Sequence, residues 1–203
     1  MTEPDFLRAT RTSYDAVATD YAERFGDELA AKPLDRAMLA GFAELVRSAG
    51  ALPVADIGCG TGSLSVLLAA EGYAVTGLDF APAMVRAARA KARAADVSAR
   101  FVLSDAAAPT LPPASFDVVL ARHVLWAMPD TSAALAGWLR LLLPGGTLVL
   151  VEGRWSTGAG LTTAEAGRAV LRYRSDAVIT ALDDPALWGG PVSDERYLLV
   201  SRR

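Results

Sequence analysis

The sequence predicts an α/β fold: a seven-stranded, mostly parallel sheet with helices on both faces and an antiparallel last strand. Short apolar segments alternate with helical ones from residue 53 onward, a pattern typical of parallel strands joined by crossover helices. Segment 116–121 is largely apolar, as expected for a strand in the buried middle of such a sheet. The last two apolar segments have no helix between them, so we expect them to pair antiparallel as a hairpin at one edge.

Two helices are expected ahead of the sheet. Aromatic and aliphatic side chains recur at spacings of three and four from Tyr14 through Tyr21 to Phe25, which places them on one helix face. A second helix follows Pro33 and ends near Gly50, because proline suits a first helical turn and glycine suits the position after a last one.

The remaining elements follow from local signals along the chain. A helix is expected after Asp130, with leucines and Trp138 on one face. The Pro-Gly-Gly sequence at 144–146 is expected to turn the chain into the strand that follows it. The expected strands are 53–57, 73–78, 100–103, 116–121, 147–151, 177–182 and 196–201. The expected helices between them are 62–70, 82–93, the helix from 131 onward, and 161–172.

Composition excludes several classes of function. The chain of 203 residues has a net charge of -3, and no basic patch of the kind that nucleic-acid binding leaves. One histidine and one cysteine provide no zinc site of the usual kinds, so we expect no metal. No run of about 18 apolar residues is present, so we expect no membrane span. The acidic start is not typical of a signal peptide, and the single cysteine fits a reducing cytoplasm, so we expect a cytoplasmic protein.

A glycine-rich loop is the strongest site signal. The sequence Asp56-Ile57-Gly58-Cys59-Gly60-Thr61-Gly62 follows a predicted strand and opens a predicted helix. Glycines there allow a tight turn and let a ligand approach the backbone, and the helix N-terminus supplies free N–H groups. Asp79 comes 17 residues after Gly62, at the end of the next strand. A carboxylate at that place can accept hydrogen bonds from both ribose hydroxyls of a nucleoside.

The spacing of the glycines separates two classes of enzyme. A nicotinamide cofactor requires G-x-G-x-x-G, whereas this loop has G-x-G-x-G and Ser63 at the third required position. This spacing argues against a nicotinamide-dependent oxidoreductase, which is kept as the alternative function. A protein that binds its nucleoside ligand without catalysis is a second alternative.

The motifs together resemble a known family. Val54 to Gly62, Gly77 to Met84, Phe101 to Ala106, Ser115 to Val119 and Leu143 to Leu148 closely resemble the class I S-adenosylmethionine (SAM)-dependent methyltransferases, in particular the ubiquinone-biosynthesis type. The resemblance covers about residues 10–152. It implies a Rossmann-like core over 51–203, a helical lid over 1–50, a single domain, and transfer of a methyl group from SAM. One departure is Ala81, where the family often has serine, which removes a helix cap.

The resemblance assigns roles by position. The glycine loop packs against the methionine part of SAM, Asp79 holds the ribose, and Phe80 and Met84 flank the adenine. Asp105 accepts from the adenine amino group, the Ala106 backbone contacts the ring, and the Arg122 carbonyl accepts from the SAM amino group. The expected cofactor-binding residues are Tyr14, Tyr21, Asp56, Gly58, Cys59, Gly60, Gly62, Asp79, Phe80, Met84, Asp105, Ala106 and Arg122. For some of these residues a purely structural role is the alternative to cofactor binding. The Tyr14/Tyr21 face either packs in the core or closes over SAM, and Cys59 is alternatively just a small residue in a tight turn.

His123 is the candidate general base. It follows the fourth strand, beside the expected methyl position, and its ordinary pKa of about 6.5 suits proton transfer near neutral pH. The alternative is that His123 packs under the loop. Trp126, Trp155 and Trp188 are candidates for the acceptor pocket or for the core. The expected acceptor is a small molecule, either a secondary metabolite or a peptide end, with no nucleic acid or membrane partner.

Overall fold

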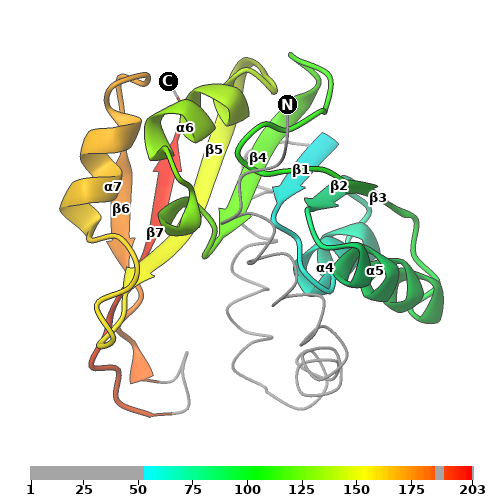
Figure 1. Ribbon diagram of the computed structural model, residues 1–203, viewed down its shortest axis with the longest axis horizontal. Helices are drawn as coiled ribbons and strands as arrows, with labels where there is room; N and C mark the ends of the chain where they lie inside the picture. The colour runs from blue at the N-terminus through cyan, green and yellow to red at the C-terminus, as the bar shows by residue number, and fades with distance from the viewer. Residues whose placement is uncertain (1–52, 186–189, 203) are drawn as a thin grey trace.

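The computed structural model describes residues 53–185 and 190–202, which form one seven-stranded sheet flanked by helices (Figure 1). The strand order is β3-β2-β1-β4-β5-β7-β6. Strands β1 to β5 run parallel to one another, and β7 lies antiparallel between β5 and β6. The predicted α/β sheet with an antiparallel last strand is confirmed. The two N-terminal helices, Tyr14, Tyr21 and Trp188 lie outside the described residues.

Most elements lie within one or two residues of their predicted positions. The strands are β1 (Pro53–Ile57), β2 (Ala74–Asp79), β3 (Ala99–Leu103), β4 (Phe116–Arg122), β5 (Leu142–Arg154), β6 (Val178–Ala181) and β7 (Glu195–Ser201). The helices are α4 (Ser63–Ala70), α5 (Pro82–Ala94), the 3-10 helix η1 (Leu125–Ala127), α6 (Thr131–Leu139) and α7 (Thr163–Val170). No helix in 53–185 or 190–202 has the length and apolar character that a bilayer crossing requires.

The sheet is buried on both faces by different helices. Figure 1 shows α4 and α5 beside the β1–β3 half of the sheet, and α6 and α7 beside the half that contains β5 and β7. On β1, Val54 belongs to the apolar cluster of Leu68 in α4, whereas Ile57 belongs to that of Trp138 in α6. Side chains alternate between the faces of a strand, so a strand covered on both sides needs apolar residues in succession. This explains the apolar central strands of the sequence.

Strand β5 is longer than the sequence predicts. It begins at Leu142 and continues through the Pro-Gly-Gly segment, where a turn was expected. The pairing with β4 shifts there, from Phe116 opposite Leu142 to Val118 opposite Thr147. Proline has no N–H to donate and Gly145 has a φ of +80°, so this segment interrupts the ladder as a bulge without ending the strand.

Caps in the sequence set the starts of two helices. Helix α6 begins after Asp130, whose side chain accepts hydrogen bonds from the Ser132 and Ala133 amides. Helix α7 begins after Thr162, and Thr162 and Glu165 form a reciprocal capping box. The predicted start at residue 161 is therefore two residues early.

The glycine loop also allows α4 and α5 to pack closely. Gly62 precedes α4 with a φ of +77°, and a Cβ there would lie 2.8 Å from the Ala88 Cβ on α5. It does not line the cavity described below. Its missing side chain therefore serves helix packing.

We expect Gly62→Ala to destabilise the protein more than Gly145→Ala. Both glycines have a similar positive φ, +77° and +80°, which costs alanine about 1–2 kcal/mol. Only at Gly62 would the new Cβ meet a neighbour, because nothing lies within 4 Å at Gly145. The clash adds about 1–3 kcal/mol. Urea unfolding of both variants checks this, and equal losses of unfolding free energy would contradict it.

Candidate functional site

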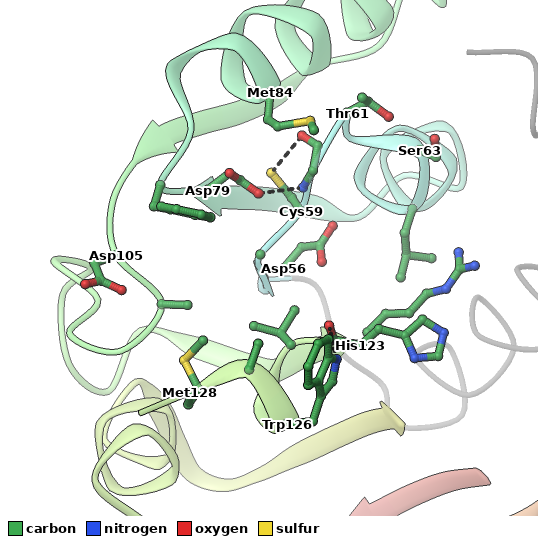
Figure 2. Close-up of a pocket in the computed structure, with 18 of the residues that line it drawn as sticks. Asp56, Cys59, Thr61, Ser63, Asp79, Met84, Asp105, His123, Trp126 and Met128 are labelled. Atoms are coloured by element: carbon green, nitrogen blue, oxygen red, sulfur yellow. Dashed lines mark hydrogen bonds between the residues drawn. The ribbon is translucent and has the colours of Figure 1, made fainter. Parts of the chain in front are cut away.

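The carboxyl ends of the parallel strands surround a cavity of about 540 Å³. Figure 2 shows Asp79 and Asp105 on one side of it and His123 and Trp126 on another. Within the described chain, every predicted site residue except Gly62 lines this cavity: Asp56, Gly58, Cys59, Gly60, Asp79, Phe80, Met84, Asp105, Ala106, Arg122 and His123. The topology therefore brings together residues that are up to 67 positions apart, from Asp56 to His123.

The glycine loop needs two glycines for different reasons. Gly58 and Gly60 both have positive φ, +66° and +54°. A Cβ on Gly58 would lie 2.6 Å from Val124 Cγ2, so this glycine lets the loop after β4 approach. A Cβ on Gly60 would have no atom within 4 Å, and Gly60 lines the cavity. The space in front of Gly60 is thus available to a ligand that contacts the backbone.

Asp79 is held at the end of β2 by backbone donors. Its Oδ2 accepts from the Gly60 amide at 2.9 Å (Figure 2). Its Oδ1 accepts from the Ala81 amide at 2.9 Å. These bonds fix the carboxylate against the glycine loop. An ionised carboxylate accepts about four hydrogen bonds, so this orientation is compatible with further bonds to a ligand.

Asp56 is a second, more deeply buried carboxyl group. It is 3% exposed, and Ser65 Oγ donates to its Oδ2 at 2.5 Å. Burial raises the pKa of Asp56 to about 6, although the bond from Ser65 and the positive charge of Arg122 act in the opposite direction. At neutral pH this group adds negative charge below the glycine loop.

The residues after β3 are held by local hydrogen bonds and line the cavity. Asp105 Oδ1 accepts from the Ala107 amide at 2.8 Å, which makes it a turn residue, and Asp105 also lines the cavity. The Ala106 carbonyl accepts from Trp138 Nε1 at 2.7 Å. The buried Trp138 of α6 thereby fixes the backbone that carries both residues.

Cys59 packs as a small residue. A Cβ on Gly77 of β2 would lie 2.9 Å from the Cys59 Sγ, so sulfur fills the space that this glycine leaves. Burial, with the charges of Asp56 and Asp79, raises the pKa of the thiol well above its ordinary value. The thiol is therefore protonated at neutral pH, which suits packing and not nucleophilic attack.

His123 lies in a strained backbone position beside an aromatic cluster. Its φ is +58°, and its amide donates to the Val151 carbonyl at 2.8 Å. The ring meets that of Trp155 edge-to-face, with centroids 5.2 Å apart. Burial lowers the pKa of His123 to about 3, with help from the charges of Arg122 and Arg196. The imidazole is neutral at pH 6 to 8, and its buried Nδ1 has no hydrogen-bond partner in the described part of the chain.

Glu152, which was not predicted as a site residue, organises the same loop from β5. Glu152 is fully buried, and its Oε1 accepts from the amides of Val124 at 3.0 Å and Leu125 at 2.7 Å. Its Oε2 has no hydrogen-bond partner within 53–185 and 190–202. Burial raises its pKa to about 7 against the effect of these bonds. The available signal was a glutamate directly after the apolar run 148–151, where a parallel strand ends.

Arg196 was also missed, and two tryptophans are now placed. Arg196 reaches the cavity from β7, where it pairs in register with Gly153 of β5. Trp126 and Trp155, candidates for the pocket or the core, both line the cavity. In the described part of the chain, no three side chains of His, Cys, Asp or Glu are grouped to hold a metal.

Comparisons with known proteins identify the family. A model described as a methyltransferase domain matches residues 55–150. An uncharacterised methyltransferase of Mycobacterium bovis is 32% identical over 134 residues, which are 62% of this chain and 67% of that protein. The chain belongs to the class I SAM-dependent methyltransferase family. The resemblance stated from the motifs is thereby confirmed, and the nicotinamide alternative receives no support.

Two further members of the comparison show how far the similarity extends. The demethylmenaquinone methyltransferase of Thermus thermophilus is 40% identical over 101 residues, which are 49% of this chain and 46% of that protein. The chain thus spans about half the length of that curated relative. The solved structure of magnesium protoporphyrin IX methyltransferase from Synechocystis has a TM-score of 0.77 at 20% identity and covers 100% of this chain and 99% of its own. That likeness concerns the fold.

The cavity fits the cofactor of this family. The open space at Gly60 accommodates a ligand against the backbone, and Asp79 is oriented beside it. A volume of about 540 Å³ lies within the usual range for small-molecule sites, about 300–1,000 Å³. The carboxylates that line it also suit a ligand with positively charged groups.

We expect the stability of the protein to fall between pH 5 and 8 because of Glu152. Its pKa is 4.5 in ordinary surroundings and about 7 in the fold, so the folded state holds the proton more tightly than the unfolded chain. This stabilisation is complete below about pH 4.5 and is lost as the pH rises towards 7. From pH 5 to 8 the wild type should lose about 2–3 kcal/mol more unfolding free energy than Glu152→Gln.

Urea unfolding at both pH values measures that difference. Glu71→Gln is the matched control, because Glu71 is exposed at the end of α4. If Glu152→Gln shows the same pH dependence as the wild type, the raised pKa of Glu152 is refuted.

Proposed function

We propose that this protein binds SAM at the glycine loop and Asp79 and transfers its methyl group to a small-molecule acceptor. The observation that carries the proposal is the geometry at the end of β2. There the Asp79 carboxylate is fixed by the Gly60 amide, directly beside the open space in front of that glycine. Named relatives act on small molecules, as the demethylmenaquinone enzyme does by its name, which supports the same acceptor class.

The chain's part in this reaction is to position the two ligands. SAM supplies a methyl group on a positively charged sulfur, which leaves as a neutral thioether. Asp79 would hold the ribose, Phe80 and Met84 the adenine, and Asp105 and Ala106 the far edge of the base. Alignment of this kind contributes about 7–11 kcal/mol in favourable cases. A protein base is required only where the acceptor must lose a proton during the transfer.

The parts of the proposal that concern residues 1–50 rest on the family resemblance. We propose that this segment is a lid that carries Tyr14 and Tyr21 over the cavity of a single domain. The single cysteine of the chain supports a reducing compartment, and we propose the cytoplasm. Among acceptors, a secondary metabolite or a peptide end fits the proposal.

Asp79→Asn should weaken SAM binding by about tenfold to a hundredfold. The change removes the negative charge that receives the ribose hydroxyls, and hydrogen bonds to charged groups are worth about 1.5–3 kcal/mol each. Calorimetric titration with SAM measures the effect. Asp96→Asn is the control, because Asp96 is exposed in the loop after α5 and does not line the cavity. An Asp79→Asn protein with wild-type affinity would place SAM elsewhere.

A general-base role for His123 remains a separate prediction. If His123 removes a proton during transfer, His123→Ala should lower the methylation rate by about 10²–10⁴-fold with little change in SAM affinity. The lowered pKa leaves the imidazole in its basic form but makes it a weak base. Single-turnover rates from pH 6 to 8 test the role. Retention of most of the rate by His123→Ala would leave positioning as the whole mechanism.

A further inference from the structure

The charged residues that line the cavity come from opposite halves of the sheet. Asp56 lies near the end of β1, Asp79 ends β2, and Asp105 follows β3. Arg122 ends β4 and Arg196 belongs to β7, on the other side of β1 in the strand order. The described lining is therefore negative at the β1–β3 end and positive at the β4–β7 end.

The positive charges of Arg122 and Arg196 both affect His123, at the positive end of the cavity. Arg122 and Arg196 are the two charges that lower the pKa of His123, after the effect of burial. Two positive charges that disfavour a protonated imidazole there would equally disfavour an ammonium group and favour an anion. Arg122 also acts on the Asp56 carboxyl group, and Arg196 Nη2 donates to Asp194 Oδ2 at 3.4 Å. A guanidinium group has five N–H donors, so one such pair does not exhaust its capacity to hold an anion.

An aromatic wall borders the same end. The Trp155 ring meets His123 at 5.2 Å and Trp126 at 5.5 Å between centroids, both edge-to-face. Trp126 is 36% exposed, and its Nε1 donates to the His123 carbonyl at 3.0 Å, which fixes the ring beside the cavity. An exposed indole whose N–H is already bonded presents an apolar surface to a ligand.

The hairpin after β5 holds Trp155 in place. Its amide donates to the Ala159 carbonyl at 2.9 Å, and the Gly158 amide donates back to the Trp155 carbonyl at 2.8 Å. Gly160 has a φ of +99°, and a Cβ there would lie 2.6 Å from the Trp155 ring. The indole is thus packed directly against Gly160. Any other residue at position 160 would displace the indole.

We infer that the methyl acceptor is a planar aromatic molecule with an anionic group, whose ring lies against Trp126 and Trp155 and whose anionic group faces Arg196. The inference rests on the proposed function, because it takes the β1–β3 end of the cavity as the SAM site. It deepens that function by naming a substrate class. An anionic acceptor also complements a donor whose methyl group is bound to a positively charged sulfur. An amine acceptor would place a positive charge beside Arg196, which disfavours it.

Binding of matched probes tests the acceptor class without turnover. The enzyme is first saturated with S-adenosylhomocysteine, and that titration is recorded separately. Calorimetry then compares 2-naphthoate, 2-naphthamide and 2-naphthylmethylammonium, which share a ring system and differ in charge. We expect 2-naphthoate to bind at least tenfold more tightly than the amide and the ammonium probe to bind most weakly. Cyclohexanecarboxylate, which keeps the charge without the aromatic ring, should bind at least fivefold more weakly than 2-naphthoate.

Variants separate the contributions of charge and ring. Arg196→Gln should reduce the preference for naphthoate over naphthamide to within threefold, whereas Arg93→Gln, an equal charge change on the exposed face of α5, should leave it unchanged. Trp155→Leu should weaken the binding of 2-naphthoate and leave the affinity for cyclohexanecarboxylate within twofold of the wild-type value. Arg196→Lys keeps the charge and should keep most of the preference. Each variant is compared only after its S-adenosylhomocysteine affinity is shown to be within twofold of wild type.

The outcomes distinguish this inference from the proposed function. Failure of S-adenosylhomocysteine to bind the wild type overturns the proposed function, and the acceptor class with it. Normal S-adenosylhomocysteine binding overturns the acceptor class alone if naphthoate does not bind or shows no preference over the amide. The same conclusion follows if the ammonium probe binds most tightly, or if Arg196→Gln behaves like Arg93→Gln.

Discussion

The buried carboxyl group of Glu152 holds together the two strand ends that form the β4–β7 side of the cavity. Its two bonds join the end of β5 to the Val124 and Leu125 amides, at the start of the loop after β4. Immediately before that loop, His123 adopts a left-handed backbone that costs a residue other than glycine about 1–2 kcal/mol. The bonds from Glu152 and from the Val151 carbonyl offset this cost.

The same loop couples the two halves of the cavity. Val124 follows His123 and packs where a side chain on Gly58 would stand. The first glycine of the cofactor loop is therefore in contact with the segment that carries the aromatic wall. A displacement of either loop must be accommodated by the other, because well-packed groups leave no space to absorb it. The glycine loop and the segment that carries the aromatic wall are in this way positioned against each other.

The sequence predicts most of the fold because the signals are local. Apolar strands, caps and glycines place most elements to within one or two residues, and the position of Asp79 follows from its distance to the loop. The 3-10 helix η1 was not predicted, and β5 is longer than predicted. The sequence does not reveal that β7 enters the sheet beside β5, since that pairing joins residues more than 40 positions apart. Arg196 was missed for this reason. Pro144 and Gly145 predict a turn by composition, but their neighbours pair with β4 on either side, so the strand continues.

The site shows the same division between local and distant information. Gly60 and Gly62 look alike in the sequence, yet one faces the cavity and the other faces Ala88 of α5. A glycine in a motif indicates that a side chain is not tolerated at that position. It does not indicate which neighbouring group, ligand or protein, occupies the space. Glu152 was missed because an isolated glutamate after an apolar run resembles a surface residue at a strand end. Its importance depends on amides supplied by a different strand.

The position of β7 has a consequence for the order in which the protein is assembled during synthesis. Strand β5 is complete at residue 154, but the strand that pairs with its second edge begins only at residue 195. Until that later segment leaves the ribosome, β5 is an open edge that is able to pair with other chains. The late strand also brings Arg196, so the positive end of the cavity forms only after most of the sheet exists. Chaperone dependence and losses to aggregation should therefore be concentrated in this interval of translation.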